Sequence, residues 1–376
     1  MRYGFTTGSC ATAAAKAAAY MLLTGKKKTE ITIETPKGIP YTTPILQIDR
    51  RENEVSCAVE KDGGDDPDIT TGALTFAKVS FGGTAVEYKK EYPQILIDGG
   101  VGVGRVTKPG LDQPVGNAAI NHVPREMITK EVLQVCKILD YKGVLQIEIS
   151  VPDGERLAEQ TFNPRLGIVG GISILGTSGM VEPMSNQAIL DTIKVELNQR
   201  KAQGFDYVAV SPGNYGLDFM KKSYGYDLDR SVKCSNFIGD TIDMAVELGF
   251  QKMLLTGHIG KLIKVAGGIM NTHSREGDCR MELLAAFAVK HGVEPKHVCE
   301  MLECVTTEEA VRILEESGRQ REVMDYAMER ICYYLNKLAK GNMQIDCIMY
   351  ANEFGELAKS KEAAEWFTLL VQEQEQ

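Results

Sequence analysis

The amino-acid sequence predicts two domains, an α+β domain over residues 1–160 and an α/β domain over residues 161–376. A chain of 376 residues is long enough for two domains. In the first part, alternating strand patterns joined by short turns outnumber helical patterns, which is typical of an α+β domain. In the second part, short apolar strands alternate with helical segments, which favours a mainly parallel sheet covered by helices.

The composition excludes several classes of protein. Hydrophobic residues make up 43% and charged residues 25% of the chain, an ordinary globular balance. The formal net charge of −9 argues against a nucleic-acid-binding protein. No apolar run approaches the roughly 20 residues that cross a bilayer, and the N-terminus does not resemble a signal peptide, so we expect a cytoplasmic protein without membrane contact.

Cysteine and histidine spacing gives no indication of a metal site. The nine cysteines include no C-x-x-C pair, and their scattered positions are typical of reduced thiols. The five histidines are equally dispersed. We therefore expect no metal site formed by the protein.

The expected elements follow these patterns. In the first domain, strands are predicted over residues 30–35, 55–60, 74–81, 94–97 and 144–151, with a helix over 124–139. In the second, strands are predicted over 207–210, 252–256 and 344–349, and helices over 187–203, 236–248, 259–266, 280–291, 306–317, 321–340 and 361–374. This domain is therefore expected to be Rossmann-like with a helical C-terminal part.

The chain opens with a hydroxyl-rich turn that runs into an alanine-rich segment, GFTTGSCATAAAK at residues 4–16. Alanine favours a helix, which we expect to begin near Ser9 and to end before Gly25. Thr6, Thr7 and Ser9 are candidate N-caps, and the unpaired N–H groups of a helix start suit an anionic group. From the residues alone, a well-capped and closely packed helix is the favoured interpretation.

Four carboxylates lie within seven residues at Asp62, Asp65, Asp66 and Asp68. Crowded carboxylates raise one another's pKa, which can leave one of them as a base. General-base chemistry, binding of a cation and contact with a positively charged cofactor are the functional interpretations. A polar turn capped by Asp68 is the structural alternative, and the residues alone favour it.

Three glycine-containing loops each follow a predicted strand. Ligands of open α/β sheets lie beyond the carboxyl ends of the strands, so three such loops in succession would form a crevice for a nucleotide-like ligand. None carries the G-x-G-x-x-G pattern, and each loop taken alone is more simply a structural turn. The predicted cofactor-binding residues are Gly176, Thr177, Ser178, Ser211, Gly213, Asn214, Thr256, Gly257 and His258.

Basic residues follow the last of these loops. Lys261 and Lys264 have the i, i+3 spacing that places them on one helix face, and His273 and Arg275 form a second polar cluster. Such cations suit the carboxylates of a ligand. A solvated basic face is an equally good interpretation of the two lysines.

Residues 4–13, 61–70 and 257–261 resemble three signatures of the cobalt-precorrin-5B methyltransferase family of anaerobic cobalamin biosynthesis. They stand in family order and span essentially the whole chain. The resemblance implies methyl transfer from S-adenosylmethionine to carbon 1 of the corrin ring of cobalt-precorrin-5B, which gives cobalt-precorrin-6A. It also implies a first domain similar to a permuted second domain of ribosomal protein S5, and cobalt that arrives in the substrate.

Taken with the resemblance, the candidate residues receive roles. Asp65 and Asp66 are expected to assist a proton transfer that accompanies methylation. The macrocycle is expected to contact Thr6, Thr7, Ser9, Asp62, Asp68, Lys261, Lys264, His273 and Arg275. Two other functions stay open: an enzyme that uses a phosphate ester or nucleotide, although the P-loop pattern is absent, and a non-catalytic tetrapyrrole-binding module. Homo-oligomer formation also stays open.

Overall fold

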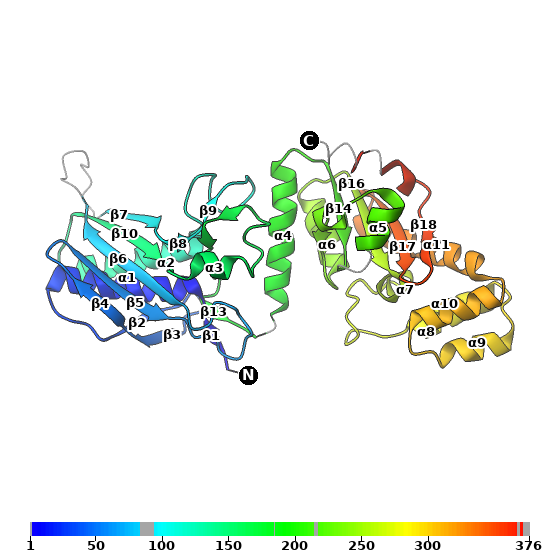
Figure 1. Ribbon diagram of the computed structural model, residues 1–376, viewed down its shortest axis with the longest axis horizontal. Coiled ribbons are helices and arrows are strands. Elements are labelled where there is room, and N and C mark those ends of the chain that lie inside the picture. The colour runs from blue at the N-terminus through cyan, green and yellow to red at the C-terminus, as the bar shows by residue number, and fades with distance from the viewer. Residues whose placement is uncertain (1, 83–93, 184, 214–216, 367–368, 371–376) are drawn as a thin grey trace. The chain divides into compact units, whose positions relative to one another are not determined.

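The computed structural model describes residues 2–82, 94–183, 185–213, 217–366 and 369–370. Contacts divide the chain into unit 1, Met1–Ser185, and unit 2, Asn186–Gln376. Both units mix helices and strands, in agreement with the expected α and β content (Figure 1). The division falls later than the expected boundary at residue 160, because short strands after that residue pair with strands of unit 1.

Unit 1 contains a five-stranded sheet in the order β4-β5-β6-β10-β7. Its pairs are antiparallel except for β10 and β7, which are parallel. Alternate residues of β6 are buried, as in a sheet with one covered face, and helix α1 packs on β5 and β6 with α2 beside it (Figure 1). The strands are β4 (Leu46–Arg50), β5 (Glu54–Glu60), β6 (Leu74–Phe81), β7 (Gln94–Gly99) and β10 (Val144–Ser150), and the helices are α1 (Thr7–Thr24), α2 (His122–Ile138) and α3 (Gly154–Ala158).

Short strand pairs complete unit 1. A hairpin joins β2 (Glu30–Glu34) and β3 (Pro40–Pro44). The other pairs bring residues after 160 back to earlier segments, which explains the later division of the chain. They are β1 (Gly4–Phe5) with β13 (Met180–Val181), β8 (Gly102–Val103) with β12 (Gly171–Ile172), and β9 (Arg105–Val106) with β11 (Ile168–Val169).

Helix α1 forms as its composition predicts. The Thr6 side chain accepts a hydrogen bond from the Ser9 N–H (3.2 Å), which makes Thr6 the N-cap. At the other end, Gly25 has a φ of 67° and donates to the Met21 carbonyl at 3.0 Å, the expected glycine C-cap. The alanines are buried all around the helix, because their small side chains let the sheet, α2 and β2 approach closely.

Unit 2 contains a five-stranded sheet in the order β15-β14-β16-β17-β18. The first four strands are parallel and β18 is antiparallel to β17. The chain leaves β14 for β15 on one side and returns to β16 on the other, so a topological switch point lies between β14 and β16. The strands are β14 (Tyr207–Ser211), β15 (Val232–Lys233), β16 (Lys252–His258), β17 (Gln344–Ala351) and β18 (Gly355–Lys359).

Hydrophobic clusters cover both faces of this sheet. Val208 and Val210 belong to a large cluster with the helices of one face, whereas Ala209 belongs to a second cluster around Trp366. Helices α8, α9 and α10 pack together beside the sheet (Figure 1). The helices are α4 (Asn186–Ala202), α5 (Leu217–Tyr224), α6 (Ile238–Glu247), α7 (Ile259–Ala266), α8 (Arg280–Lys290), α9 (Pro295–Leu302), α10 (Thr307–Glu316) and α11 (Gln320–Ala339), with 3-10 turns at Leu228–Arg230 and Ala363–Glu365.

Several elements differ from the expectation. Helices α5 and α9 and strands β3, β4, β15 and β18 were not predicted, since they are short and their patterns are weak. The predicted helix over 361–374 falls partly outside the described residues. Within the described ranges, no helix is long and apolar enough to cross a membrane.

Gly4 offers a test of the packing in unit 1. A Cβ there would lie 2.2 Å from the Gly63 carbonyl carbon, and backbone atoms cannot move aside as side-chain ends do. We expect Gly4→Ala to destabilise unit 1 by about 2 kcal/mol. The urea midpoint measured by circular dichroism should fall. Trp366 is the single tryptophan and lies in unit 2, so the midpoint measured by its fluorescence should not change.

Gly277→Ala is the matched control. A Cβ at Gly277 would meet only the Ile269 side-chain end, at 3.3 Å. We expect a change within about 0.5 kcal/mol. Equal effects of the two substitutions would contradict the close packing assigned to Gly4.

Candidate functional site

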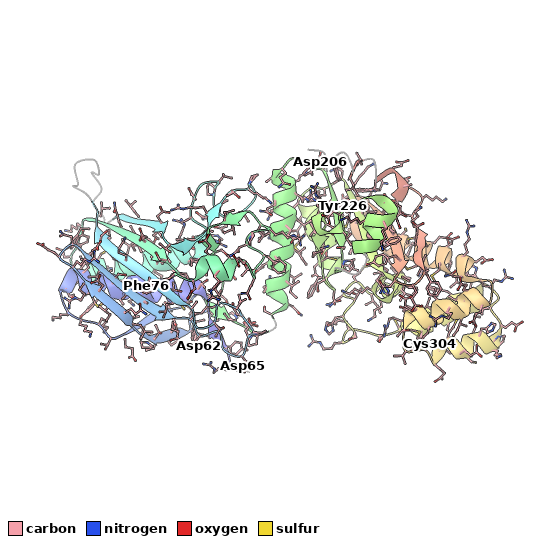
Figure 2. All side chains as sticks on the ribbon, viewed as in Figure 1. Asp62, Asp65, Phe76, Asp206, Tyr226 and Cys304 are labelled. Atoms are coloured by element: carbon pink, nitrogen blue, oxygen red, sulfur yellow. The ribbon has the colours of Figure 1, made fainter. Side chains whose placement is uncertain are left out.

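The N-terminal turn and the acidic loop, two separate predicted features, lie together in unit 1. The Phe5 N–H donates to the Asp62 carbonyl (2.8 Å), and the Asp65 N–H donates to the Arg2 carbonyl (3.0 Å). In return, the Arg2 N–H donates to Asp65 Oδ2 at 2.6 Å. Figure 2 shows Asp62 and Asp65 close together in this unit. Tertiary structure therefore joins segments that lie some 60 residues apart in the chain.

Asp62 is held by an arginine that the sequence analysis did not identify. The Arg2 guanidinium donates to both carboxylate oxygens, with an Nη2–Oδ1 distance of 2.8 Å, and the Gly64 N–H donates to Oδ1 at 3.0 Å. These hydrogen bonds, the one from Arg2 above all, hold the pKa of Asp62 below its ordinary value. No motif signals this pairing in the sequence.

Asp68 belongs to a buried ion pair. Lys61 is only 4% exposed, and its ammonium bonds to the Asp68 carboxylate and to Thr70 Oγ1 (2.5 Å). Thr70 donates to Asp68 Oδ1 through its N–H (2.8 Å) and its hydroxyl (2.6 Å). Burial by itself would raise the pKa of Asp68, but the Lys61 charge and the hydrogen bonds outweigh it, so the pKa is lowered. The geometry gives Asp68 a structural role in the loop.

The catalytic candidates lie on the same loop. Asp65 is exposed and Asp66 is half-buried. In the same loop, Asp62 is bound to Arg2 and Asp68 to Lys61, and Asp65 Oδ2 accepts the Arg2 N–H.

The hydroxyl groups of the N-terminal turn are buried and bonded inside unit 1. Thr6 caps α1, Thr7 Oγ1 donates to the Leu175 carbonyl (3.3 Å), and Ser9 Oγ donates to the Gly179 carbonyl (2.6 Å). These contacts connect the turn to the loop 176–179. The interpretation of this segment as a well-capped and closely packed helix start therefore describes its geometry well.

The loop 176–179 differs from the expectation that three glycine loops gather at one sheet edge. A Cβ on Gly176 would lie 2.2 Å from Thr6 Oγ1, so this loop covers the start of α1. Thr177 is exposed, and Ser178 Oγ donates to the Met180 carbonyl at 3.0 Å. The strand after the loop pairs with β1 and not with the parallel sheet of unit 2, so only two of the three loops follow strands of that sheet.

Those two loops meet at the switch point between β14 and β16. Lys261 donates to the Pro212 carbonyl (2.7 Å) after β14 and to the Ser235 carbonyl (3.2 Å) after β15. Burial lowers the pKa of Lys261. Gly213 is half-buried beside Pro212. This is the edge at which ligands of doubly wound sheets lie.

The other predicted residues of these loops are placed as follows. Ser211 and Thr256 are buried, and Ser211 bonds to the Ser231 hydroxyl at 2.8 Å. A Cβ on Gly257 would lie 3.0 Å from Leu262, so this glycine allows α7 to turn back onto β16. Asn214 lies outside the described residues.

His258 ends β16 and caps α7. Its Nδ1 accepts the Gly260 N–H (3.0 Å), so the ring proton lies on Nε2, which donates to Glu308 Oε1 (3.1 Å). The same carboxylate oxygen accepts the Asn352 N–H at 2.8 Å, just after β17. Sequence reasoning missed Glu308. The capping box at Thr306 predicts where α10 begins, but the pairing with His258 is purely tertiary.

The basic residues separate into two groups. Lys264 is buried, and it donates to the Thr272 carbonyl at 3.2 Å, which excludes a fully solvated basic face. His273 and Arg275 are exposed on the loop between α7 and α8, where the Arg275 N–H donates to His273 Nδ1 (3.1 Å). In the described part of the chain, no group of three or more His, Cys, Asp or Glu side chains could hold a metal ion.

The structure thus combines a mixed α/β unit with a doubly wound α/β unit whose carboxyl edge has a charged, glycine-containing switch point. The family described as CbiD matches residues 1–183, and its C-terminal domain family, CbiD_C, matches residues 271–361. This chain belongs to the CbiD family.

Curated relatives match along nearly the whole chain. The cobalt-precorrin-5B C(1)-methyltransferase of Ruminiclostridium cellulolyticum is 47% identical over 94% of this chain and 89% of its own length. The protein of the same name from Thermoanaerobacter sp. is 45% identical over 97% of each chain. The crystal structure of a cobalamin biosynthesis protein (CbiD) from Archaeoglobus fulgidus shares 26% identity and a TM-score of 0.38, covering 73% of this chain and 84% of that chain.

The Lys61–Asp68 pair gives a prediction for stability. Asp68→Asn leaves a buried ammonium without its counter-charge, and we expect it to lower the free energy of unfolding by about 3 kcal/mol at pH 7. Because the pKa of Asp68 is lowered in the folded state, its contribution is present above the ordinary value of 3.8 and is lost as the pH falls through the folded pKa. The difference between wild type and variant should therefore narrow in acid.

Urea unfolding at several pH values measures this difference. Asp49→Asn is the control, because Asp49 forms an exposed pair with Arg51 that contributes at most about 1 kcal/mol. A difference that stays constant down to pH 2 would show that the carboxylate charge of Asp68 does not stabilise the loop.

Proposed function

We propose that this chain methylates carbon 1 of cobalt-precorrin-5B with S-adenosylmethionine as the methyl donor. The observation that carries the proposal is similarity over both units to relatives named for this reaction, 47% identical over 94% of the chain. A corrinoid is accordingly the small-molecule substrate, and its cobalt belongs to that substrate. Within this proposal, unit 1 has the fold of a permuted second domain of ribosomal protein S5.

The methyl donor binds at the carboxyl edge of the unit 2 sheet. In doubly wound sheets, this edge at the switch point is where ligands lie. The loops after β14 and β16 supply Ser211, Gly213, Thr256, Gly257 and His258, and the Lys261–Pro212 hydrogen bond supports the arrangement. The loop 176–179, which packs on the start of α1, is left out of this donor site.

The macrocycle binds to the acidic loop of unit 1. Asp65 lies at the surface of unit 1, beside Asp62 and its partner Arg2. In unit 2, the exposed His273 and Arg275 are cations that suit carboxylates of a ligand, through charge-assisted hydrogen bonds. The buried hydroxyl groups at the start of α1 hold the shape of the unit 1 surface through their hydrogen bonds.

The chemistry requires little from protein side chains. The electron pair of the ring carbon attacks the sulfonium methyl group, a C–C bond forms as the C–S bond breaks, and S-adenosylhomocysteine leaves as a neutral thioether. Positioning of the two bound molecules and exclusion of water supply most of the rate. Asp65 or Asp66 accepts a proton that is displaced during methylation.

Calorimetric titration tests the cofactor assignment. The purified chain should bind S-adenosylhomocysteine saturably, with or without cobyrinic acid as a corrinoid carboxylate, and should not bind ATP–Mg²⁺. Binding of ATP–Mg²⁺ alone would replace the methyltransferase assignment with that of a nucleotide-using enzyme.

Replacing the two candidate bases tests the proton transfer. We expect Asp65→Asn or Asp66→Asn to slow methylation of cobalt-precorrin-5B about 100-fold or more, because a general base contributes at least this much. The affinity for S-adenosylhomocysteine should be unchanged, and the exposed Asp49→Asn should behave as wild type. Wild-type rates in both variants would remove this role from the loop.

A further inference from the structure

Two lysines at the carboxyl edge of unit 2 have no carboxylate partner in the described part of the chain. Lys261 donates to two carbonyl groups, and Lys264, 3% exposed, donates to the Thr272 carbonyl at 3.2 Å. Among the residues that the structure describes, no carboxylate oxygen lies within the 4.0 Å of an ion pair with either ammonium. Lys264 is buried and Lys261 is half-buried, and charges withdrawn from water are normally paired, so these two cations indicate a position for an anion.

The surroundings of the lysines add to the positive charge. Lys261 lies in the first turn of α7, near the positive end of the helix dipole, where an anion is favourable and a cation is not. Asp278 is affected by the charge of Lys264, but two hydrogen bonds of 2.6 and 2.8 Å already bind it to Arg280, and hydrogen bonding to Arg280 is the largest cause of its lowered pKa. Asp278 therefore does not serve as the missing partner.

The Glu308 carboxylate, which has the opposite charge, lies on the other side of His258. Glu308 accepts hydrogen bonds from His258 and Asn352 with Oε1 alone. Its Oε2 is covered by protein atoms and has no hydrogen-bond partner among the described residues. The two ring nitrogens of His258 are both engaged, Nδ1 by the Gly260 N–H and Nε2 by Glu308 Oε1. Among the described residues, no lysine or arginine pairs with Glu308, whose side chain is 18% exposed, so this carboxylate favours a cationic group beside it.

The two groups lie along one sheet edge. Lys261 reaches the loop after β14, Glu308 bonds to the segment after β17, and His258 ends β16 between them. Three neighbouring strands span about 10 Å. An α-amino acid with one hydrogen bond at each end bridges about 9 Å. The edge therefore presents a cation on one side of His258 and an anion on the other, an order of charges that suits a zwitterion.

We propose that Lys261 binds the carboxylate and Glu308 the ammonium group of the amino-acid end of the methyl donor, with Lys264 as added positive charge. The inference rests on the proposed function, because S-adenosylmethionine carries such a zwitterion. It moves Lys261 and Lys264 from the macrocycle, where the sequence analysis placed them, to the donor site. It also adds Glu308, a residue without a sequence signature.

A series of three ligands tests each half separately by calorimetry. S-adenosylhomocysteine carries both charged groups, its decarboxylated analogue carries only the ammonium, and 5′-methylthioadenosine carries neither. For the wild-type chain, we expect affinity to fall about 10-fold or more at each step, as for a charge-assisted hydrogen bond. Lys261→Met should weaken only S-adenosylhomocysteine, and Glu308→Gln should weaken the first two ligands but not the third.

Matched controls are Lys252→Met, an exposed lysine at the opposite end of β16, and Glu315→Gln, an exposed glutamate on α10. Both should bind all three ligands as wild type does. Because the ligand series on the wild-type chain needs no substitution, a variant that fails to fold leaves the test intact. Equal affinities of the wild type for the three ligands overturn the zwitterion site.

Other outcomes separate this inference from the function on which it rests. If Lys261→Met weakens cobyrinic acid and not S-adenosylhomocysteine, the lysine binds the macrocycle and the inference is wrong, while the proposed function stands. If the wild-type chain binds none of the three adenosyl ligands, even with cobyrinic acid present, both the methyl donor and the inference are wrong.

Discussion

Close approach of main chains at glycine holds the unit 1 site together. Gly4 and Gly63 meet where a single added Cβ would lie 2.2 Å from backbone, and a Cβ on Gly64 would lie 2.3 Å from the Arg2 carbonyl oxygen. The hydrogen bonds between the N-terminal turn and the acidic loop form only at this separation. The placement of Asp62 and Asp65 therefore depends on positions that carry no side chain.

Unit 2 depends on a different constraint. Positively charged side chains lie at one part of a sheet edge, and a negatively charged side chain lies at the other. A parallel sheet buried on both faces leaves its strand ends as the places where polar groups gather. Here Lys261 and Lys264 lie on one side and Glu308 lies on the other, each incompletely satisfied by the residues that the structure describes. Incompletely satisfied polar groups favour additional partners, which the proposed ligand would supply.

Local patterns predicted most long elements well because their causes are local. The β6 strand was predicted at its observed bounds, as was α7, and α1 has the expected glycine C-cap. Alternation, helix period and capping act within a few residues, so one sequence suffices to find them. Short edge strands such as β15 and β18 were not predicted, because pairing with neighbouring strands, and not their own residues, makes them strands.

The sequence by itself determined the family, the two-part organisation and the candidate segments, since motif residues and hydrophobic periods are written in the order of the chain. Only the tertiary structure decided which segments meet. It joined the acidic loop to the N-terminal turn, assigned the loop 176–179 to unit 1 and paired His258 with Glu308. The physical reason is that these contacts cross 50 to 170 residues of chain, a separation at which local preferences carry no information.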